Sequence, residues 1–306
     1  MSKIGFIGLG NMGAPMARRL LAAGHDLVVQ DLSADAVARM VDDGAAAAPS
    51  PAAVAASAET VLTSLPSPQA LEAVAVGEDG VREGSVIRRL VDLSTVGAPA
   101  SQRVARALAE RSIALVDAPV SGGVKGAAAG TLAVMVAAAA IEREVVEPLL
   151  GALGKVIVIG EEPGMAQVMK LVNNYLSATA IVATGEALAV GAKAGIDPAT
   201  MLEVINSGSG RNTSTESKFP AEVLSGRFDV GFALGGMYKD VRLFTEQAED
   251  SSVPLWVGSA VRNLWQYGNA QMGGTVDMMN VIRPIEDWAG VELRATEDGD
   301  RGGDHE

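Results

Sequence analysis

The sequence predicts an α/β domain with a doubly wound, mostly parallel sheet, followed by an all-α domain that a long helix joins to it. Three observations predict this fold class. Short β-branched runs alternate with alanine-rich helical stretches up to Gly160, no strand pattern follows that glycine, and an uninterrupted helical pattern begins just behind it. Strand–helix alternation is typical of parallel sheets whose two faces are both covered by helices.

The β-branched runs give the expected strands of the first domain. They are residues 4–7, 27–30, 61–64, 86–92 and 115–117, with further runs at 132–136 and 156–159 that extend the sheet. The long helical pattern starts at Pro163-Gly164 and continues to about Ala194, which corresponds to roughly 45 Å of helix. Later helices are expected at 198–206, 236–250, 254–268 and 275–289.

The change of pattern also sets the expected domain boundaries. Residues 1–161 form the α/β domain and residues 162–293 form the helical domain. Residues 294–306 are mainly Asp, Glu, Gly and Arg, and a segment with so little apolar surface to bury is expected to form a disordered acidic tail.

The overall charge and the absence of targeting patterns exclude several classes of partner. The net charge of −13 argues against binding to nucleic acids or to anionic membrane surfaces, because both select basic patches. No basic segment followed by a short apolar stretch opens the chain, so a cytoplasmic location is expected. The longest uncharged helical stretch, residues 171–185, is too short to span a bilayer.

The residue inventory restricts the chemistry. The chain has no cysteine, which removes thiolate nucleophiles and zinc–thiolate sites, and we expect no bound metal. It has only two histidines, His25 in a Gly-His-Asp turn and His305 in the tail. Neither is placed for catalysis, so an acid or base must be Lys, Tyr, Asp or Glu.

A glycine motif opens the chain and predicts a dinucleotide site. Gly8, Gly10 and Gly13 follow the first strand in the pattern G-x-G-x-x-G, and a helical stretch begins directly behind them. In a Rossmann fold these glycines permit a tight turn, a close approach of a pyrophosphate and close helix–sheet packing. The N–H groups at the start of the helix then face the phosphates.

Asp31 at the end of the second strand supports the same prediction. It lies about 20 residues after the glycines, where the fingerprint has an acidic residue for the ribose hydroxyls. A carboxylate here would repel a 2′-phosphate, and no arginine in residues 32–36 would neutralise one. NAD is therefore expected rather than NADP.

The residue types present in the chain also narrow the possible types of dehydrogenase. Zinc enzymes and histidine-dependent enzymes are excluded, and none of the three tyrosines is followed four residues later by a lysine. Lys170 stands among apolar residues near the start of the long helix, with Asn174 one turn further on the same face. A dry environment favours the neutral amine, which can accept a proton. On spacing alone, a lysine that merely pairs with a carboxylate explains the pattern equally well.

Four segments stand out in order along the chain: Gly-Leu-Gly-Asn-Met-Gly-Ala-Pro-Met-Ala at 8–17, Asp-Ala-Pro-Val-Ser-Gly-Gly at 117–123, residues 164–174, and residues 232–240 ending in Lys-Asp. Together they resemble the β-hydroxyacid dehydrogenase family, which includes 3-hydroxyisobutyrate dehydrogenase and tartronate semialdehyde reductase. The resemblance extends over residues 3–293. It implies a reversible, NAD-dependent exchange of a hydride with a small 3-hydroxy acid, which gives the semialdehyde or keto acid.

The resemblance also implies site residues. Lys170 matches the catalytic lysine and Asn174 the asparagine that orients the substrate, while Ser121, Gly122 and Gly123 match the loop that holds the substrate carboxylate. A hydroxyl and consecutive backbone N–H groups can surround an anion in this way. The residues that match cofactor contacts are Gly8, Gly10, Asn11, Met12, Gly13, Asp31, Leu65, Pro66, Thr95 and Lys239.

Other interpretations remain open at this stage. An imine-reductase-like enzyme is the second, and Lys170 counts against it because such enzymes usually lack this lysine. A non-catalytic protein that senses NAD is the third. Arg211, in the segment 208–213, is expected to bind a second acidic group of the substrate, although a surface role is also compatible. For Lys239, pairing with Asp240 on the helix surface is the less favoured alternative. Self-association to a dimer or tetramer is expected from the family.

Overall fold

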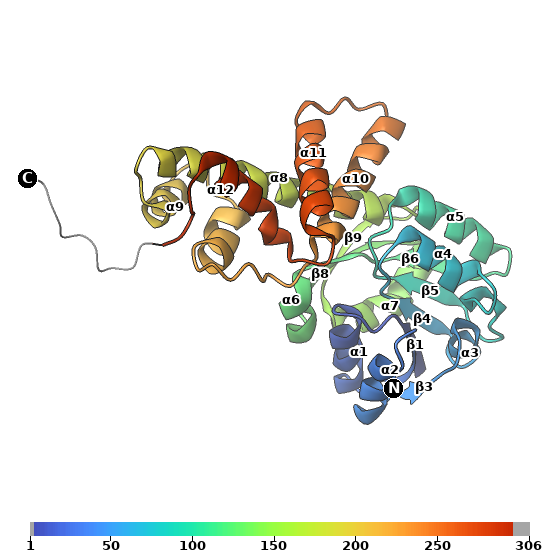
Figure 1. Cartoon of the computed structure of the whole chain (residues 1–306). Helices are drawn as coiled ribbons and strands as arrows, with labels where there is room; N and C mark the ends of the chain where they lie inside the picture. Colours follow the sequence, from blue (N-terminus) through green and yellow to red (C-terminus); the bar gives the residue numbers. More distant parts are fainter. Residues whose placement is uncertain (1–2, 296–306) are drawn as a thin grey trace, which may run out of the picture. The chain divides into compact units, whose positions relative to one another are not determined.

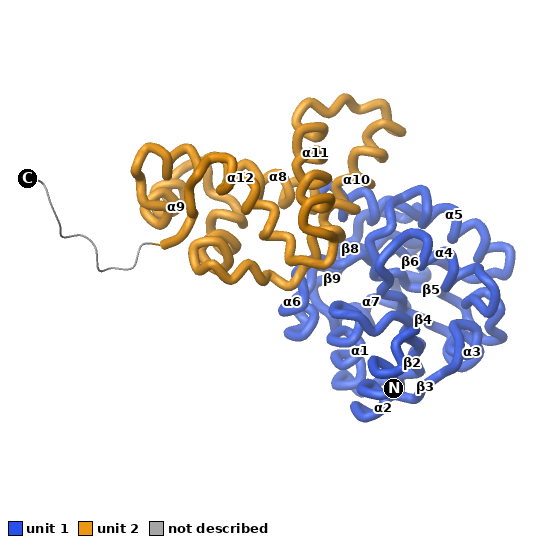
Figure 2. The backbone as a smooth tube through the Cα atoms, in the orientation of Figure 1, with its two compact units in different colours: residues 1–172 blue, residues 173–306 orange. Residues whose placement is uncertain are grey.

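The computed structural model describes residues 3–295 and has two compact units, residues 1–172 and 173–306 (Figure 2). The division falls inside the long helix α8 (Met165–Lys193), whereas the boundary expected from the sequence lies just before this helix. From residue 296 onward the expected acidic tail lies outside the described residues.

Unit 1 contains a nine-stranded sheet in the order β3-β2-β1-β4-β5-β6-β8-β7, with β9 paired to β8 (Figure 1). The strands up to β6 are parallel, and their order 3-2-1-4-5-6 is that of a dinucleotide-binding Rossmann sheet. The strands are β1 (Lys3–Ile7), β2 (Asp26–Gln30), β3 (Ala46–Ala47), β4 (Thr60–Thr63), β5 (Arg89–Asp92), β6 (Ala114–Asp117), β7 (Val120–Ser121), β8 (Leu132–Ala137) and β9 (Gly154–Gly160).

Helices cover both faces of this sheet. Strand residues alternate between the two faces, so that Leu62 packs in one apolar cluster while its neighbour Val61 packs in the other. The first cluster includes α1 (Gly13–Ala22), α2 (Ala34–Asp42), α6 (Gly123–Ala129) and α7 (Ala140–Gly151). The second includes α3 (Pro51–Ala55), α4 (Pro68–Val76) and α5 (Ala98–Ala109), with the short 3₁₀ helix η1 (Val81–Glu83).

Local sequence signals start several of these helices where the chain leaves a strand. Ser33, Ser50 and Ser67 each accept a hydrogen bond from the backbone N–H three residues later, which caps α2, α3 and α4. Proline occupies the first turn of α3, α4 and α5, where a missing N–H removes no helical bond.

The end of the sheet differs from the pattern that the sequence shows. β8 runs antiparallel to β6 and β7 and parallel to β9. The two-residue strands β3 and β7 are absent from the sequence prediction, because two residues carry no detectable alternation. β7 nevertheless matters for the site, since it ends at Ser121.

Unit 2 is helical. Its elements are the second half of α8, then α9 (Pro198–Ser207), η2 (Ser214–Val223), α10 (Leu234–Asp250), α11 (Trp256–Met272), η3 (Met278–Ile282) and α12 (Arg283–Ala289). They enclose one apolar core in which Phe219 and Trp265 are fully buried. Among the described residues of this unit, the only strand-like pairing is a single bridge between Ala233 and Asp277.

Two segments of unit 2 depart from the sequence prediction. The helix expected at 275–289 is divided into η3 and α12, because Asp277 caps the N–H of Met279 and Pro284 begins a new helical turn. Residues 214–223, for which no helix was expected, form a π-helical segment that contains Pro220. The proline interrupts the regular α-helical bonding pattern, which explains why the segment lacks a clear helical signature.

By length and composition alone, α8 is the one helix within residues 3–295 that could cross a membrane, with a mean hydropathy of 1.3. Several of its side chains pack inside the protein. Ala166 lies in an apolar cluster of unit 1, and Ala178 and Ile181 lie in the core of unit 2. A core helix passes the same composition test, and α8 contributes buried residues to the apolar clusters of both units.

The tryptophans of α11 provide a stability test of unit 2. Trp265 is 0% exposed and Trp256 on the same helix is 90% exposed. We expect Trp265→Ala to lower the free energy of unfolding by about 3–5 kcal/mol, since it removes a large buried side chain. Trp256→Ala is the matched control and should change it by about 0.5 kcal/mol or less. Urea unfolding followed by circular dichroism measures both; equal effects of the two substitutions would contradict the assigned core.

Candidate active site

The glycine loop between β1 and α1 is shaped by close backbone contacts. Gly8 has a φ of +93°, and a Cβ atom there would lie 2.3 Å from the carbonyl oxygen of Ser64. A Cβ at Gly13 would lie 1.8 Å from the carbonyl oxygen of Gly8. Gly10 differs, because a Cβ there would meet nothing within 4 Å. The loop is therefore tightly packed on its inner side and open at Gly10, as the approach of a pyrophosphate requires.

Asp31, directly after β2, is tied to this loop. Its Oδ2 accepts a hydrogen bond of 2.6 Å from the N–H of Leu9, and its Oδ1 accepts one of 2.7 Å from the N–H of Ser33. Each carboxylate oxygen can accept a further bond. The side chain is thus held at the end of β2 and keeps capacity for the hydroxyls of a ribose.

Two further loops follow the carboxyl ends of β4 and β5. The N–H of Leu65 donates to Ser94 Oγ at 2.8 Å, which joins the loop of Leu65 and Pro66 to the segment that contains Thr95. Ser94 Oγ in turn donates to Asp92 Oδ1 at 2.5 Å. The predicted residues Gly8, Leu65 and Thr95 therefore lie on neighbouring loops at one edge of the sheet.

The predicted carboxylate loop follows β6 in the same sheet. Ser121 ends β7, and Gly122 and Gly123 lead into α6 with φ values of +135° and +65°. Both glycines are exposed and Ser121 is half-buried. The positive φ values require glycine, and they leave the backbone of the turn accessible beside the hydroxyl of Ser121.

Lys170 and Asn174 lie one turn apart on α8, and each is 7% exposed. Gln167, one turn before Lys170, is fully buried. These three polar residues form a stripe along one face of the helix. A lysine so deeply buried is unusual and marks the face of α8 on which chemistry is expected.

In unit 2, Asp240 joins two of the predicted residues. Asn174 Nδ2 donates to Asp240 Oδ2 at 2.7 Å, and Lys239 Nζ lies 3.1 Å from Asp240 Oδ1. Asn173 Nδ2 also donates to Asn174 Oδ1 at 3.1 Å. The pairing of Lys239 with Asp240 that the sequence allowed is present, and because Asp240 is buried it also fixes the amide of Asn174.

Arg211 stands apart from these residues. It pairs with Glu216 at 3.6 Å, and the two side chains are 64% and 49% exposed. The hydrogen bonds of this segment are local: Asn212 Oδ1 caps the N–H of Ser214, and Thr215 Oγ1 accepts from the N–H of Asn212. The described contacts do not join Arg211 to another predicted site residue.

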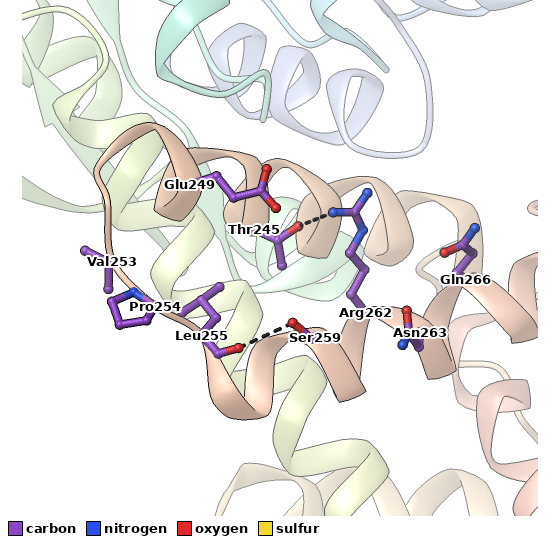
Figure 3. Close-up of a pocket in the computed structure, with 9 residues that line it drawn as sticks. All are labelled: Thr245, Glu249, Val253, Pro254, Leu255, Ser259, Arg262, Asn263 and Gln266. Atoms are coloured by element: carbon purple, nitrogen blue, oxygen red, sulfur yellow. Dashed lines mark hydrogen bonds between the residues drawn. The ribbon is translucent and has the colours of Figure 1, made fainter.

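A separate open hollow lies between α10 and α11 (Figure 3). Its lining includes Thr245, whose hydroxyl accepts a hydrogen bond of 3.1 Å from Arg262, and Ser259, which donates to the carbonyl of Leu255. None of the predicted site residues lines it. The hollow is therefore distinct from the predicted active-site residues.

Comparison with known proteins identifies the family. The family described as "NAD binding domain of 6-phosphogluconate dehydrogenase" matches residues 3–160, and "NAD-binding of NADP-dependent 3-hydroxyisobutyrate dehydrogenase" matches residues 164–285. The 2-(hydroxymethyl)glutarate dehydrogenase of Eubacterium barkeri is 39% identical over 295 residues, which cover 95% of this chain and 97% of that protein. The chain belongs to the β-hydroxyacid dehydrogenase family.

Further relatives support the assignment to the β-hydroxyacid dehydrogenase family. The 3-hydroxyisobutyrate dehydrogenase of Pseudomonas aeruginosa is 39% identical over 274 residues, which cover 87% of this chain and 91% of that protein. The structure of Mycobacterium tuberculosis 3-hydroxyisobutyrate dehydrogenase with L-serine has a TM-score of 0.85 at 28% identity, covering 93% and 99% of the two chains. The protein is an NAD-dependent oxidoreductase that acts on the CH–OH group of a small hydroxy acid.

The residues present fit NAD. Open space at Gly10, the tight packing of Gly8 and Gly13, and the tethered Asp31 match what a Rossmann fold needs to hold a pyrophosphate and a ribose. When bound, NAD supplies the acceptor of the hydride. The dehydrogenase itself must supply the group that exchanges a proton with the substrate hydroxyl.

The sequence did not single out three buried residues that bond to predicted site residues or to their loops. Asp240 was considered only as a possible partner of Lys239, and Asp117 only as part of the motif that leads to Ser121. Gln167 carried no signal, since a glutamine next to apolar residues in a helix is commonplace. The pattern that would have revealed Gln167 is the stripe of polar residues at 167, 170 and 174 within an apolar helix.

The tether of Asp31 generates a test of cofactor choice. We expect Asp31→Asn to lower the ratio of the Kd for NADP to the Kd for NAD by about tenfold or more, because the charge that repels the 2′-phosphate is removed. Asp35→Asn, at an exposed position in the first turn of α2, is the matched control. Fluorescence titration with both nucleotides measures the ratio, and an unchanged ratio in Asp31→Asn would contradict the assignment.

Proposed function

We propose that this enzyme oxidises a small 3-hydroxy acid with Lys170 as the general base, and that Lys170 returns the proton as general acid in the reverse reaction. The burial of Lys170 on the polar face of α8 is the observation that carries this proposal. In oxidation, the neutral Lys170 Nζ accepts the proton of the substrate hydroxyl as the hydroxyl-bearing carbon gives up its hydride. The products are the semialdehyde or keto acid, NADH and a proton.

The proposed substrate contacts follow from the two loops and from Asn174. Ser121, Gly122 and Gly123 are proposed to bind the carboxylate through a hydroxyl and backbone N–H groups. Asn174 is proposed to orient the substrate. The hydrogen bonds of its amide to Asp240 and Asn173 support this role, because a fixed amide presents its polar atoms in one orientation.

The proposed cofactor contacts use the loops at the sheet edge. Asp31 is proposed to bind the ribose, and Thr95 to lie beside the nicotinamide. Lys239, held by Asp240, is proposed to close over the cofactor. The other proposed contacts are Gly8, Gly10, Asn11, Met12, Gly13, Leu65 and Pro66.

The two alternative functions have less support. Imine reductases occur among solved structures with this fold, and that of Streptomyces aurantiacus is 23% identical, a likeness that extends to the fold alone. An enzyme that reduces imines does not need a buried lysine that accepts a hydroxyl proton. A sensor of NAD without turnover needs neither Lys170 nor a carboxylate loop.

The relatives suggest which substrates to compare. Their names include 2-(hydroxymethyl)glutarate, 3-hydroxyisobutyrate and L-serine, all with a hydroxyl on the carbon β to a carboxylate. The first of these carries a second carboxylate. We propose that Arg211 binds such a second acidic group, and its exposed pairing with Glu216 leaves the guanidinium able to exchange partners.

Self-association to a dimer or tetramer is part of the proposal. Large apolar side chains are exposed on α8 and α9, among them Leu176, Val190 and Val204. Such side chains are favoured at contacts between subunits. A cytoplasmic location is proposed as well, since the reaction draws on a dissolved pool of NAD.

The role of Lys170 is tested by removal and chemical rescue. We expect Lys170→Ala to lower kcat by about 10²–10⁴-fold while NAD still binds, because a positioned proton acceptor is lost. Added ethylamine should restore part of the rate. Lys155→Ala, at an exposed strand position, is the control. NADH absorbance with 3-hydroxyisobutyrate, L-serine and 2-(hydroxymethyl)glutarate measures turnover; a Lys170→Ala rate within threefold of wild type would refute the proposal.

The role of Arg211 is tested by substrate comparison. We expect Arg211→Gln to raise the KM for 2-(hydroxymethyl)glutarate by about tenfold, the equivalent of one ion pair of about 1.4 kcal/mol, and to leave 3-hydroxyisobutyrate kinetics unchanged. Arg103→Gln, which breaks the exposed pair with Glu72, is the control. Equal kinetics of Arg211→Gln and wild type on both acids would assign Arg211 to the surface instead.

A further inference from the structure

The first turn of α8 is anchored to the sheet edge by a side chain outside the helix. The N–H of Gly164, immediately before α8, donates to the carboxylate of Asp117 at the end of β6. The first N–H groups of a helix have no partner within it, and a carboxylate at this end also interacts favourably with the helix dipole. Asp117 is itself held by Ser101 Oγ of α5, which donates to it at 2.5 Å.

Gln167 provides a second anchor, to the loop after β5. Its Oε1 accepts hydrogen bonds from the N–H groups of Val96 and Gly97 at 2.9 and 3.3 Å. Its Nε2 donates to the carbonyl oxygen of Ser94 at 3.1 Å. These bonds reach the backbone on both sides of Thr95, the residue proposed to lie beside the nicotinamide. The amide is fully buried, so each bond is shielded from water.

The two anchoring side chains also interact with each other. Gln167 also forms a hydrogen bond with Asp117, and Asp92 on the adjacent strand stands opposite Asp117 in the register. Burial raises the pKa of Asp117 to about 6, while the bonds from Ser101, Gly164 and Gln167 oppose that rise and the charge of Asp92 adds to it. At neutral pH, Asp117 is therefore ionised and accepts charge-assisted bonds, which are stronger than neutral ones.

The anchoring residue Gln167 and the lysine lie on the same face of α8. Lys170 lies three residues after Gln167 and shares its buried face. Met165 and Met169, on another face of the same turns, are 43% and 37% exposed. A rotation of the helix that exposed Gln167 would also move Lys170 out of its buried position.

We propose that Asp117 and Gln167 are positioning residues that fix the rotation and depth of the first two turns of α8, and thereby the direction of Lys170 relative to the loop of Thr95. The inference rests on the proposed role of Lys170 as the proton carrier. A misplacement of a reacting group by about 1 Å can reduce a rate by about 100-fold, so such anchors bear directly on catalysis.

A double-mutant cycle tests whether Gln167 acts through Lys170. The enzymes are wild type, Gln167→Met, Lys170→Ala and the double variant, with Gln271→Met on the exposed side of α11 as control. Methionine matches glutamine in length but removes the hydrogen bonds. We expect Gln167→Met to lower kcat by about tenfold or more, with the Kd for NAD within about threefold of wild type. In the Lys170→Ala background the same change should have little effect on kcat.

The outcomes separate the two proposals. If Lys170→Ala is as active as wild type, the proposed function fails whatever Gln167→Met does. If Lys170→Ala is impaired but Gln167→Met is within twofold of wild type, only the positioning role fails. It also fails if Gln167→Met weakens NAD binding as much as kcat, or if its effect is equally large without Lys170. Thermal unfolding of each variant confirms that rates are measured on folded protein.

The dependence of kcat on pH tests the Asp117 anchor separately. The measurement uses the reduction direction, in which Lys170 is the proposed proton donor. Protonation of Asp117 weakens the bond to Gly164, so kcat of wild type should fall as the pH drops through about 6. We expect Asp117→Asn to have a lower kcat at pH 7.5 and to lack this acidic limb. An unchanged limb, or a wild-type kcat at pH 7.5, would overturn the role of Asp117.

Discussion

The parallel pairing of β1, β4, β5 and β6 is the constraint on which the proposed site depends. Ile7 pairs with Thr63, Thr63 with Asp92, and Asp92 with Asp117, so the strands end along a single row. The loops that leave this row carry the glycine turn, Leu65, Thr95 and Ser121. A slip of one residue in any of these pairings would send the strand side chains to the opposite face and separate the loops.

Buried carboxylates order the residues at these strand ends by accepting hydrogen bonds from them. Asp92 accepts hydrogen bonds from Thr63 and Ser94, and Asp117 accepts them from Ser101 and Gly164. A buried charge is costly unless it is hydrogen-bonded, so these groups persist only with their partners in place. In unit 2, Asp240 uses the same principle to hold Asn174 and Lys239. Asp240 thus holds two residues with proposed roles, whereas Asp92 and Asp117 hold the segment before Thr95 and the start of α8.

In the proposal, different residues serve cofactor binding, the reaction itself and the choice of substrate. The glycine turn and Asp31 are proposed to bind the cofactor, and Asp31 to favour NAD, a cofactor that serves many different reactions. In the proposed mechanism, the hydroxy-acid chemistry depends on Lys170 and on a loop that binds a carboxylate. The identity of the acid depends on further side chains, of which Arg211 is the most exposed candidate. Relatives with similar scaffolds can therefore act on different hydroxy acids.

The sequence by itself determined the two-domain organisation, the parallel sheet, the long helix and the dinucleotide fingerprint, because strand alternation, helical periodicity and glycine spacing are local properties. It also predicted a catalytic role for Lys170, for which the apolar surroundings left an alternative and the family resemblance favoured catalysis. Only the tertiary structure revealed that η2 is π-helical, that residues 275–289 form two helices, and that Asp117 and Gln167 anchor α8. Gln167 bonds to Val96, far away in the chain, and such long-range hydrogen bonds leave no periodic trace in the sequence. They arise only when the strand ends and the helix start are brought to the same edge of the sheet.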